Sequence, residues 1–494
     1  MNSLRHSRRP AAGALLAAVI ATLIAGCGSA STSATATAPS TTETTAVQTT
    51  VAPATSAAPA TTTTALDREG LPVVMDTDMA VEGAMSILYL LGKPEIDVRA
   101  ITVSGTGLVH CAPGVRQALG LVELAGAGEI PVACGPEQPL EGFNAFPTSW
   151  RVGADDLYGV DLPEGGAPSD LPAPELLVSV IEEAGEPVVV YADGPMTNLA
   201  AALRLEPAIT GDIAGVVAMG GAVGVPGNTI KNPDAEWNVW VDPVAAAEVF
   251  ASGVPISLVP LDATSQVPLN AFHLRALQAH RGSGVADVVA EMLAGDEQLK
   301  SGVLYFWDQL AAALLVDQSL ATFETMDLEV VTEGTRDAAG ATLAGGGSPV
   351  SVAVAVDVER FEREFLSVMA GEPIGPIAKD ADITVGFDGE EWAIDAPASL
   401  PAGEAVLSFA NSGAGDALVA LGRLTGGATE QDLEATPFSV EPPPFFELDG
   451  YGLAPPGDGI VVVVALGVPG SRYVTGLDLG AGEKAVIARI EVGG

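Results

Sequence analysis

Short apolar runs alternate with amphipathic stretches along residues 71–371 of the chain. Continuous apolar strands separated by helices are typical of a mostly parallel sheet with helices on both faces. The sequence therefore predicts an α/β fold for this part of the chain. Strands are expected at 72–76, 98–104, 130–134, 187–192, 213–219 and 255–260, and helices near 81–92, 111–126, 174–184, 196–204 and 243–252.

The pattern changes in two further parts of the same region. Residues 136–172 are rich in Gly, Pro and Asp without a clear period, which predicts a long surface loop near the mouth of the sheet. Residues 270–320 look helical throughout. A strand at 326–331, a Gly-rich turn at 344–347, a strand at 350–356 and a closing helix at 358–370 are expected to follow.

Residues 376–494 carry short β-like runs, such as ITVGF, AVLSFAN, IVVVVAL and KAVIARI, divided by Gly, Pro and Asp. This pattern predicts a small all-β sandwich domain. Two of its segments, PAGEAVLSFANSG and LGAGEKAVIARI, resemble cupredoxin-like modules. Neither a histidine nor a cysteine occurs after residue 280, so the ligands of a blue-copper site are missing. We interpret the domain as a structural or interaction module.

The N-terminus has the pattern of a targeting signal at 1–27. Arginines precede an apolar run at 11–24, which ends in IAGC at Cys27. This resembles the lipobox of bacterial lipoproteins, which implies cleavage before Cys27 and lipidation of its thiol; an ordinary signal peptide or an uncleaved anchor is the alternative. Residues 28–66, rich in Ser, Thr, Ala and Pro, predict a disordered linker. The α/β domain at 67–375 would then be held to the membrane through a lipid, on the extracytoplasmic side.

The chain is strongly acidic, with 21 Lys and Arg against 63 Asp and Glu and a formal net charge of −42 over 494 residues. Such a charge makes nucleic acids and anionic membrane surfaces poor partners. It does not identify an enzyme, because an acidic surface is usually only a solvated one.

Two cysteines remain besides Cys27. Cys111 lies at the start of a predicted helix, and Cys134 ends the strand that follows it. A helix and a returning strand of similar length bring these positions to the same edge of the sheet. The sequence therefore predicts either a Cys111–Cys134 disulfide or two buried free thiols.

Candidate chemistry begins in the segment VVMDTDMAVEGA at 73–84. A predicted buried strand delivers Asp76 and Asp78 to the carboxyl edge of the sheet, where α/β enzymes bind their ligands. A solvated strand edge is the alternative for two such acids. The rest of the chain favours a site, because residues 71–371 resemble the inosine-uridine-preferring nucleoside hydrolases. The resemblance lies in DTDMAVEGA, YADGPMTNLAAALRLEP, AEWNVWVDPVAAAEVF and FWDQLAAALLVD.

The resemblance implies cleavage of the N-glycosidic bond of ribonucleosides to ribose and free base, with a water activated by Ca²⁺. It implies that Asp78 is both a calcium ligand and the base. It further implies calcium ligation by Asp308 and by the main-chain carbonyl of Asp193. The residues that would contact the substrate are Glu82, Glu236, Asn238 and Trp307, joined by Asn228 or Asn232.

The chain departs from the family pattern at several of these positions. The family has two consecutive aspartates where this chain has Glu82 and Gly83, so one calcium carboxylate is absent. Calcium should bind more weakly, unless Glu82 or the Asp193 side chain fills the gap. Thr106 stands where the family has asparagine, and Trp307 where it has the histidine before Asp308.

Two other functions remain open. One is a catalytically impaired lipoprotein that binds a ribosyl or sugar ligand without turnover. The other is a surface interaction protein whose sandwich domain carries the function. Because members of the family commonly assemble as dimers or tetramers, the resemblance also implies a homo-oligomer.

Overall fold

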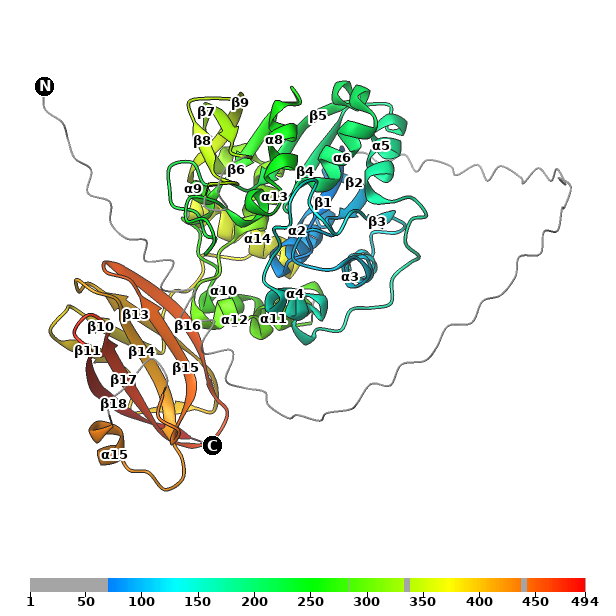
Figure 1. Cartoon of the computed structure of the whole chain (residues 1–494). Coiled ribbons are helices and arrows are strands. Elements are labelled where there is room, and N and C mark those ends of the chain that lie inside the picture. Colours follow the sequence, from blue (N-terminus) through cyan, green and yellow to red (C-terminus); the bar gives the residue numbers. More distant parts are fainter. Residues whose placement is uncertain (1–69, 283, 333–337, 437–441, 494) are drawn as a thin grey trace, which may run out of the picture.

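A computed structural model of the chain describes residues 70–282, 284–332, 338–436 and 442–493. An α/β part comes first along the chain, and an all-β part follows it (Figure 1). The predicted signal segment, its Cys27 and the predicted linker lie outside the described residues. Among the described residues, no helix is both long and apolar enough to cross a membrane.

The α/β part is built on a nine-stranded sheet with the order β3-β2-β1-β4-β5-β6-β9-β7-β8. The strands from β3 to β9 in that order are parallel, and β7 and β8 are antiparallel at one edge. This confirms the predicted fold class. The strands are β1 (Leu71–Thr77), β2 (Ile96–Val103), β3 (Val132–Cys134), β4 (Val188–Ala192), β5 (Ile213–Met219), β6 (Ile256–Val259), β7 (Ala321–Val330), β8 (Thr342–Ala344) and β9 (Ser348–Val356).

Helices cover both faces of this sheet because its central strands are apolar on both faces. In β1, Val73 and Met75 pack into one hydrophobic core, whereas Val74 packs into the core on the other face. The first core includes α2 (Val81–Leu91), α3 (Cys111–Leu124), α13 (Trp307–Val316) and α14 (Val358–Ala370). The second includes α5 (Ala173–Glu183), α6 (Thr197–Leu205) and α8 (Pro243–Ala251).

Two segments differ from what the sequence predicted. The segment 136–172, predicted as a loop, contains helix α4 (Thr148–Asp155) and the short helix η1 (Leu157–Gly159). The prediction failed because α4 is short and begins after Pro147 without a capping side chain. The helical segment 270–320 is divided into several helices, of which α13 is the last long one. The others are α10 (Ala271–Gln278), α11 (Val285–Gly295), α12 (Glu297–Ser301) and η3 (Gln318–Leu320).

Cys111 and Cys134 form a disulfide, so the bridge rather than the pair of free thiols is present. The bridge joins the start of α3 to the end of β3. It therefore links two segments at the carboxyl edge of the sheet, next to the connection that follows β2.

The all-β part forms two sheets with a common hydrophobic core, as predicted for a sandwich. Strands β11, β12, β14, β15 and β17 were not anticipated individually. One sheet has the order β11-β10-β13-β16 and the other β12-β18-β17-β14-β15. The elements are β10 (Ile383–Phe387), β11 (Trp392–Asp395), β12 (Ser399–Pro401), β13 (Gly403–Asn411), β14 (Ala417–Leu424), α15 (Glu430–Ala435), β15 (Phe446–Ala454), β16 (Asp458–Leu466), β17 (Gly470–Asp478) and β18 (Glu483–Gly493).

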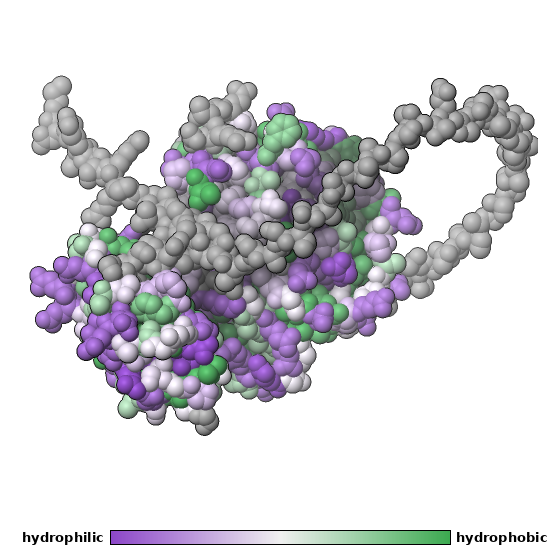
Figure 2. All heavy atoms as spheres, turned by 60° about the horizontal axis from the view of Figure 1, so that its bottom comes forward, coloured by the Kyte–Doolittle hydropathy of each residue, from purple (hydrophilic) through white to green (hydrophobic). Residues whose placement is uncertain are grey.

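The sandwich packs against the helical segment of the first part. Ala271 and Phe272 of α10 form a small buried cluster with Val406 of β13. Figure 1 shows α10 and α12 lying between the sandwich and the large sheet. On the face drawn in Figure 2, hydrophilic residues are spread over the surface with hydrophobic residues scattered among them, as is usual for a folded protein.

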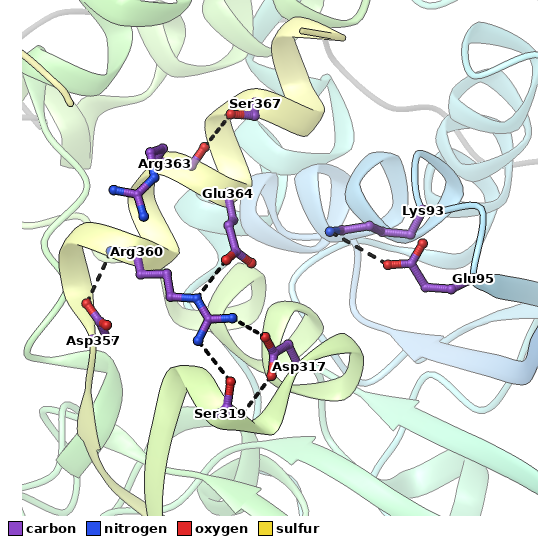
Figure 3. A network of polar contacts seen from close by, with 9 residues as sticks. All are labelled: Lys93, Glu95, Asp317, Ser319, Asp357, Arg360, Arg363, Glu364 and Ser367. Carbon is purple, nitrogen blue, oxygen red and sulfur yellow. Dashed lines mark hydrogen bonds and ion pairs between the residues drawn. The ribbon is translucent and has the colours of Figure 1, made fainter. Parts of the chain in front are cut away.

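Helix α14 is fixed at its N-terminal end by a network of charges (Figure 3). The Arg360 guanidinium pairs with Asp317 and Glu364, and it donates a hydrogen bond of 2.9 Å to the Ser319 hydroxyl. Asp357 caps the helix by accepting from the Arg360 amide. The network holds α14 against the end of α13, whose first turn carries Asp308.

Candidate active site

The strand order reverses between β1 and β4, since β2 and β3 lie on one side of β1 and β5 and β6 lie beyond β4. Such a reversal opens a crevice at the carboxyl ends of the strands, where ligands bind in open α/β sheets. Asp78 follows β1 and Asp193 follows β4, so both acids stand at this crevice.

A tight turn fixes Asp78. Met79 has a φ of 59°, and its amide donates to the Thr77 hydroxyl at 3.1 Å. The Asp78 carboxylate accepts from the Ala80 amide at 3.1 Å through Oδ1 and from the Leu108 amide at 3.0 Å through Oδ2. Burial raises the pKa of this carboxyl to about 6 despite these hydrogen bonds. The turn thus presents one carboxylate in a single orientation with a pKa suited to a base near neutral pH.

Two glycines make room for Asp78. A Cβ added at Gly107 would lie 2.1 Å from the Asp78 Cβ, and one added at Gly194 would lie 2.6 Å from it. Both distances are shorter than a nonbonded contact allows. The loops after β2 and β4 can therefore approach Asp78 only because they carry glycine at these points.

The main chain of Asp193 is hydrogen-bonded to neighbouring residues, whereas its side chain lies in the acidic crevice. Its amide donates to the Asp76 carbonyl at 3.1 Å, and its carbonyl accepts from Asn238 Nδ2 at 3.1 Å. The side chain is buried, and among the described residues neither carboxylate oxygen accepts a hydrogen bond of ordinary geometry, although the nearby hydroxyls of Thr77 and Tyr191 lower its pKa. Unpartnered buried carboxylate oxygens are costly unless a ligand satisfies them.

Asp308 completes an acidic cluster. It lies in the first turn of α13, and its main-chain carbonyl accepts from the Tyr191 hydroxyl at 2.8 Å. One carboxylate oxygen from each of Asp78, Asp193 and Asp308 lies within 4.8 Å of the other two, and all three residues are buried. Burial, and then the neighbouring acids, raise the pKa values of Asp193 and Asp308 well above the ordinary range. This arrangement fits a cation with oxygen ligands.

Asp76 stabilises the strands and the helix that surround the site. Its Oδ1 accepts from the Thr102 hydroxyl and from Asn198 Nδ2, both at 2.8 Å. Burial raises its pKa to about 7. These contacts tie together β1, β2 and α6, so Asp76 holds the strands that carry the cluster.

Glu82 and Gly83 lie at the start of α2, beside the cluster. The Glu82 side chain is buried, and burial followed by the charge of Asp296 raises its pKa well above normal. Asp78 and Asp193 add smaller contributions in the same direction. Glu82 is therefore close enough to the cluster to interact with it, although it is not one of the three grouped acids.

Glu236 and Asn238 are brought to the same place by α7 (Trp237–Val241), a short helix that the sequence did not predict. Glu236 caps this helix, accepting from the Asn238 amide at 2.8 Å and from the Val239 amide at 3.1 Å. It also accepts from the Gly221 amide at 3.0 Å. Burial raises the pKa of Glu236 to about 7.

The other predicted substrate contacts have structural partners. Asn228 is exposed and accepts from the Trp237 amide, whereas Asn232 holds a turn and donates to the Ala339 carbonyl. Thr106 bonds the Thr197 hydroxyl at 2.9 Å. Trp307 is half-buried next to Asp308 and packs against the Tyr305 ring, with centroids 5.6 Å apart.

Arg151 is a site residue that sequence reasoning missed, because it belongs to α4. Its guanidinium is buried and donates to the Gly105 carbonyl at 2.9 Å. Its positive charge favours the ionised form of Asp78. Residues 136–172 show no clear hydrophobic period, so no pattern in the sequence marked Arg151 as a site residue.

The raised pKa values predict how the stability of the metal-free protein depends on pH. In the folded state, Asp76 and Asp78 hold their protons up to a pH of about 6 to 7, whereas the ordinary value is 3.8. The folded protein therefore binds more protons than the unfolded chain in this window, and its stability falls as the pH rises. Thermal unfolding in a chelator should occur at a lower temperature at about pH 7.5 than at about pH 5.5. An unfolding temperature that rises over this interval would contradict the prediction.

Comparisons with known proteins identify relatives of this chain. The family model for inosine-uridine preferring nucleoside hydrolases matches residues 73–363. The pyrimidine-specific ribonucleoside hydrolase RihA of Citrobacter koseri is 38% identical over 224 residues, covering 45% of this chain and 70% of that protein.

Solved structures show the same fold. A plant nucleoside hydrolase, PpNRh1, matches with a TM-score of 0.56 at 30% identity, covering 61% of this chain and 99% of its own. The purine-preferring ribonucleoside hydrolase of Gardnerella vaginalis matches with a TM-score of 0.55 at 29% identity, covering 61% and 98%. The family match spans more than half of the chain and includes each member of the acidic cluster. The chain therefore belongs to the family of inosine-uridine preferring nucleoside hydrolases.

Proposed function

We propose that this protein hydrolyses the N-glycosidic bond of ribonucleosides to ribose and free base in a calcium-dependent reaction. The acidic cluster carries the proposal, since its three buried carboxylates converge at the strand-order reversal and no basic side chain neutralises the Asp193 carboxylate among the described residues. One of the similar proteins named above is pyrimidine-specific and another is purine-preferring, so the proposed substrate class is ribonucleosides rather than one base.

The cluster provides the oxygen ligands that calcium prefers. Asp78 and Asp308 would offer carboxylates, and the Asp193 carbonyl keeps a second lone pair besides its bond to Asn238. A calcium ion bound there would supply positive charge that orients and acidifies a water and grips the ribose hydroxyls.

In this proposal Asp78 takes the proton from the attacking water. Its two backbone hydrogen bonds hold the carboxylate in one orientation, which lowers the cost of arranging the reaction. The water oxygen bonds to the anomeric carbon, and the bond from that carbon to the base nitrogen breaks. The base nitrogen takes up a proton from solvent, and Asp78 afterwards returns the water's proton to solvent.

Glu82, Glu236 and Asn238 would orient the ribose. Glu236 already accepts three backbone amides, so its carboxylate is fixed before substrate binds. Asn238 is held from its Nδ2 side by the Asp193 carbonyl, which leaves its side-chain oxygen for a sugar hydroxyl. Preorganised polar groups of this kind lower the reorganisation needed at the transition state.

The site is poorly equipped to protonate the leaving base. The residue before Asp308 is Trp307, which cannot donate a proton as histidine does. Trp307→His should raise kcat/KM for natural nucleosides by about 10-fold or more, in line with the usual worth of an acid catalyst. p-Nitrophenyl riboside, whose leaving group needs no proton, should gain little. Trp307→Phe is the matched control. An equal effect on both substrates would contradict a leaving-group role.

The proposed function is tested by incubating the full-length protein with a panel of ribonucleosides and calcium, followed by a reducing-sugar assay. Release of ribose that disappears with a chelator supports the proposal. If no nucleoside is cleaved, while a nucleoside raises the unfolding temperature, the protein is instead a binder of ribosyl ligands without turnover.

We further propose that Cys27 is lipidated and that both folded parts work on the extracytoplasmic side of the cell membrane. The lipobox-like IAGC run and the Ser/Thr-rich segment after it support this location. Metabolic labelling with a fatty acid should mark the wild type but not Cys27→Ser. A small-molecule nucleoside or ribosyl ligand as partner, and a homo-oligomer, follow from the family resemblance.

A further inference from the structure

We propose that the Asp193 carboxylate is a metal ligand that occupies the place of a side chain at residue 83. This inference rests on the proposed calcium-dependent function and specifies which atoms would bind the ion. It assigns the side chain of Asp193, in addition to its main chain, to the cluster. It also gives Gly83 a defined role.

The first observation is that the protein satisfies the Asp193 carboxylate incompletely. The side chain is 99% buried, and in the described part of the chain neither Oδ1 nor Oδ2 accepts a hydrogen bond of ordinary geometry. The hydroxyls of Thr77 and Tyr191 lie near it and lower its pKa, but burial and the neighbouring acids outweigh them. A carboxylate in this position faces Asp78 and Asp308, with ligand oxygens within 4.8 Å of one another. Three acids facing one another without a counterion repel, and a divalent cation between them would satisfy the free oxygens.

The second observation concerns the space beside α2. A Cβ added at Gly83 would lie 3.3 Å from Asp193 Oδ2 and 3.6 Å from Oδ1. The Asp193 carboxylate therefore stands where a side chain at residue 83 would extend. It can do so because residue 83 has no side chain, and an aspartate there would present its own carboxylate to the same point.

These distances make residues 83 and 193 alternative sources of one negative charge. Two segments meet beside the cluster: the first turn of α2, which carries residue 83, and the loop after β4, which carries residue 193. If residues 83 and 193 both carried a carboxylate, the cluster would be crowded. If neither did, only Asp78 and Asp308 would remain as acids. Calcium affinity depends on the number of charged ligands, so exactly one of the two positions should carry the acid.

The test measures calcium binding to the full-length protein by titration calorimetry, with thermal unfolding in parallel. Asp193→Asn keeps the size of the side chain and removes its charge. It should weaken calcium binding on the order of 100-fold. In chelator, the same variant should unfold at a higher temperature than the wild type, because the buried repulsion is reduced.

A relocation variant separates a ligand role from a merely structural one. Gly83→Asp combined with Asp193→Ala should recover most of the lost calcium affinity. Gly83→Asn combined with Asp193→Ala has the same shape without the charge and should not. Because the new Cβ would approach the Thr77 hydroxyl at 2.7 Å, circular dichroism should confirm that both double variants fold.

The outcomes distinguish this inference from the proposed function. A wild type that binds no calcium overturns the calcium-dependent function itself. A wild type that binds calcium, with an unchanged affinity in Asp193→Asn, overturns only the role of the Asp193 side chain. A folded relocation variant no better than its asparagine control would also count against the equivalence of the two positions.

Discussion

Asp78→Asn should lower kcat/KM for ribonucleosides by about 10³-fold or more, because one residue would lose both its roles as base and as metal ligand. The change removes a charge but keeps the shape of the side chain. The amide oxygen can still accept from one of the two backbone amides that hold Asp78. Steady-state kinetics on the wild type and the variant measure the loss.

Asp212→Asn is the matched control for this prediction. Asp212 is exposed and lies just before β5, at the opposite edge of the sheet from the cluster. It should retain wild-type kinetics. If Asp78→Asn folds as the wild type does and still turns over nucleosides within a few fold of it, Asp78 is not the base and the proposed mechanism is wrong.

Gly107→Ala should reduce activity by about 10²-fold although it replaces no polar group of the site, since small displacements of catalytic groups have effects of this size. The new methyl group would lie 2.1 Å from the Asp78 Cβ and 3.0 Å from its Cα. Either the loop after β2 or the turn at Asp78 must move. Calcium affinity should fall together with kcat.

Gly211→Ala provides the corresponding control, since a Cβ at that glycine meets no atom within 4 Å. Its activity and calcium affinity should equal those of the wild type. A Gly107→Ala protein with unchanged kinetics would show that Asp78 does not need its observed position.

Most of the large sheet could be predicted from the sequence, because parallel strands buried on both faces appear as continuous apolar runs. Ile213–Met219 and Val358–Ala370 have the predicted bounds. Short elements stabilised by tertiary contacts could not be predicted in this way. Helix α4 has only local polar character, and α7 is a single turn capped by Glu236. Several sandwich strands were missed because Gly interrupts their alternation, as at Gly450 and Gly452 in β15.

Part of the candidate site could likewise be predicted from the sequence, and part could not. Asp78, Asp193 and Asp308 were identified because each follows a strand or opens a helix within a motif that resembles a known family, and they lie together in the structure. The sequence did not show which atoms of Asp193 face the others, since that depends on the space left by Gly83. It also did not show that Asn228 and Asn232 hold backbone turns.

The short distance between residue 83 and the Asp193 carboxylate bears on how related genes are sorted into enzymes and non-enzymes. A filter that demands two consecutive aspartates after the first strand would discard this chain as inactive. If the carboxylate has moved as inferred above, Asp193, immediately before the Gly-Pro turn, compensates for the glycine at residue 83, where the filter expects the second aspartate. Screening criteria should therefore count the acids that can reach the cluster, whichever loop supplies them.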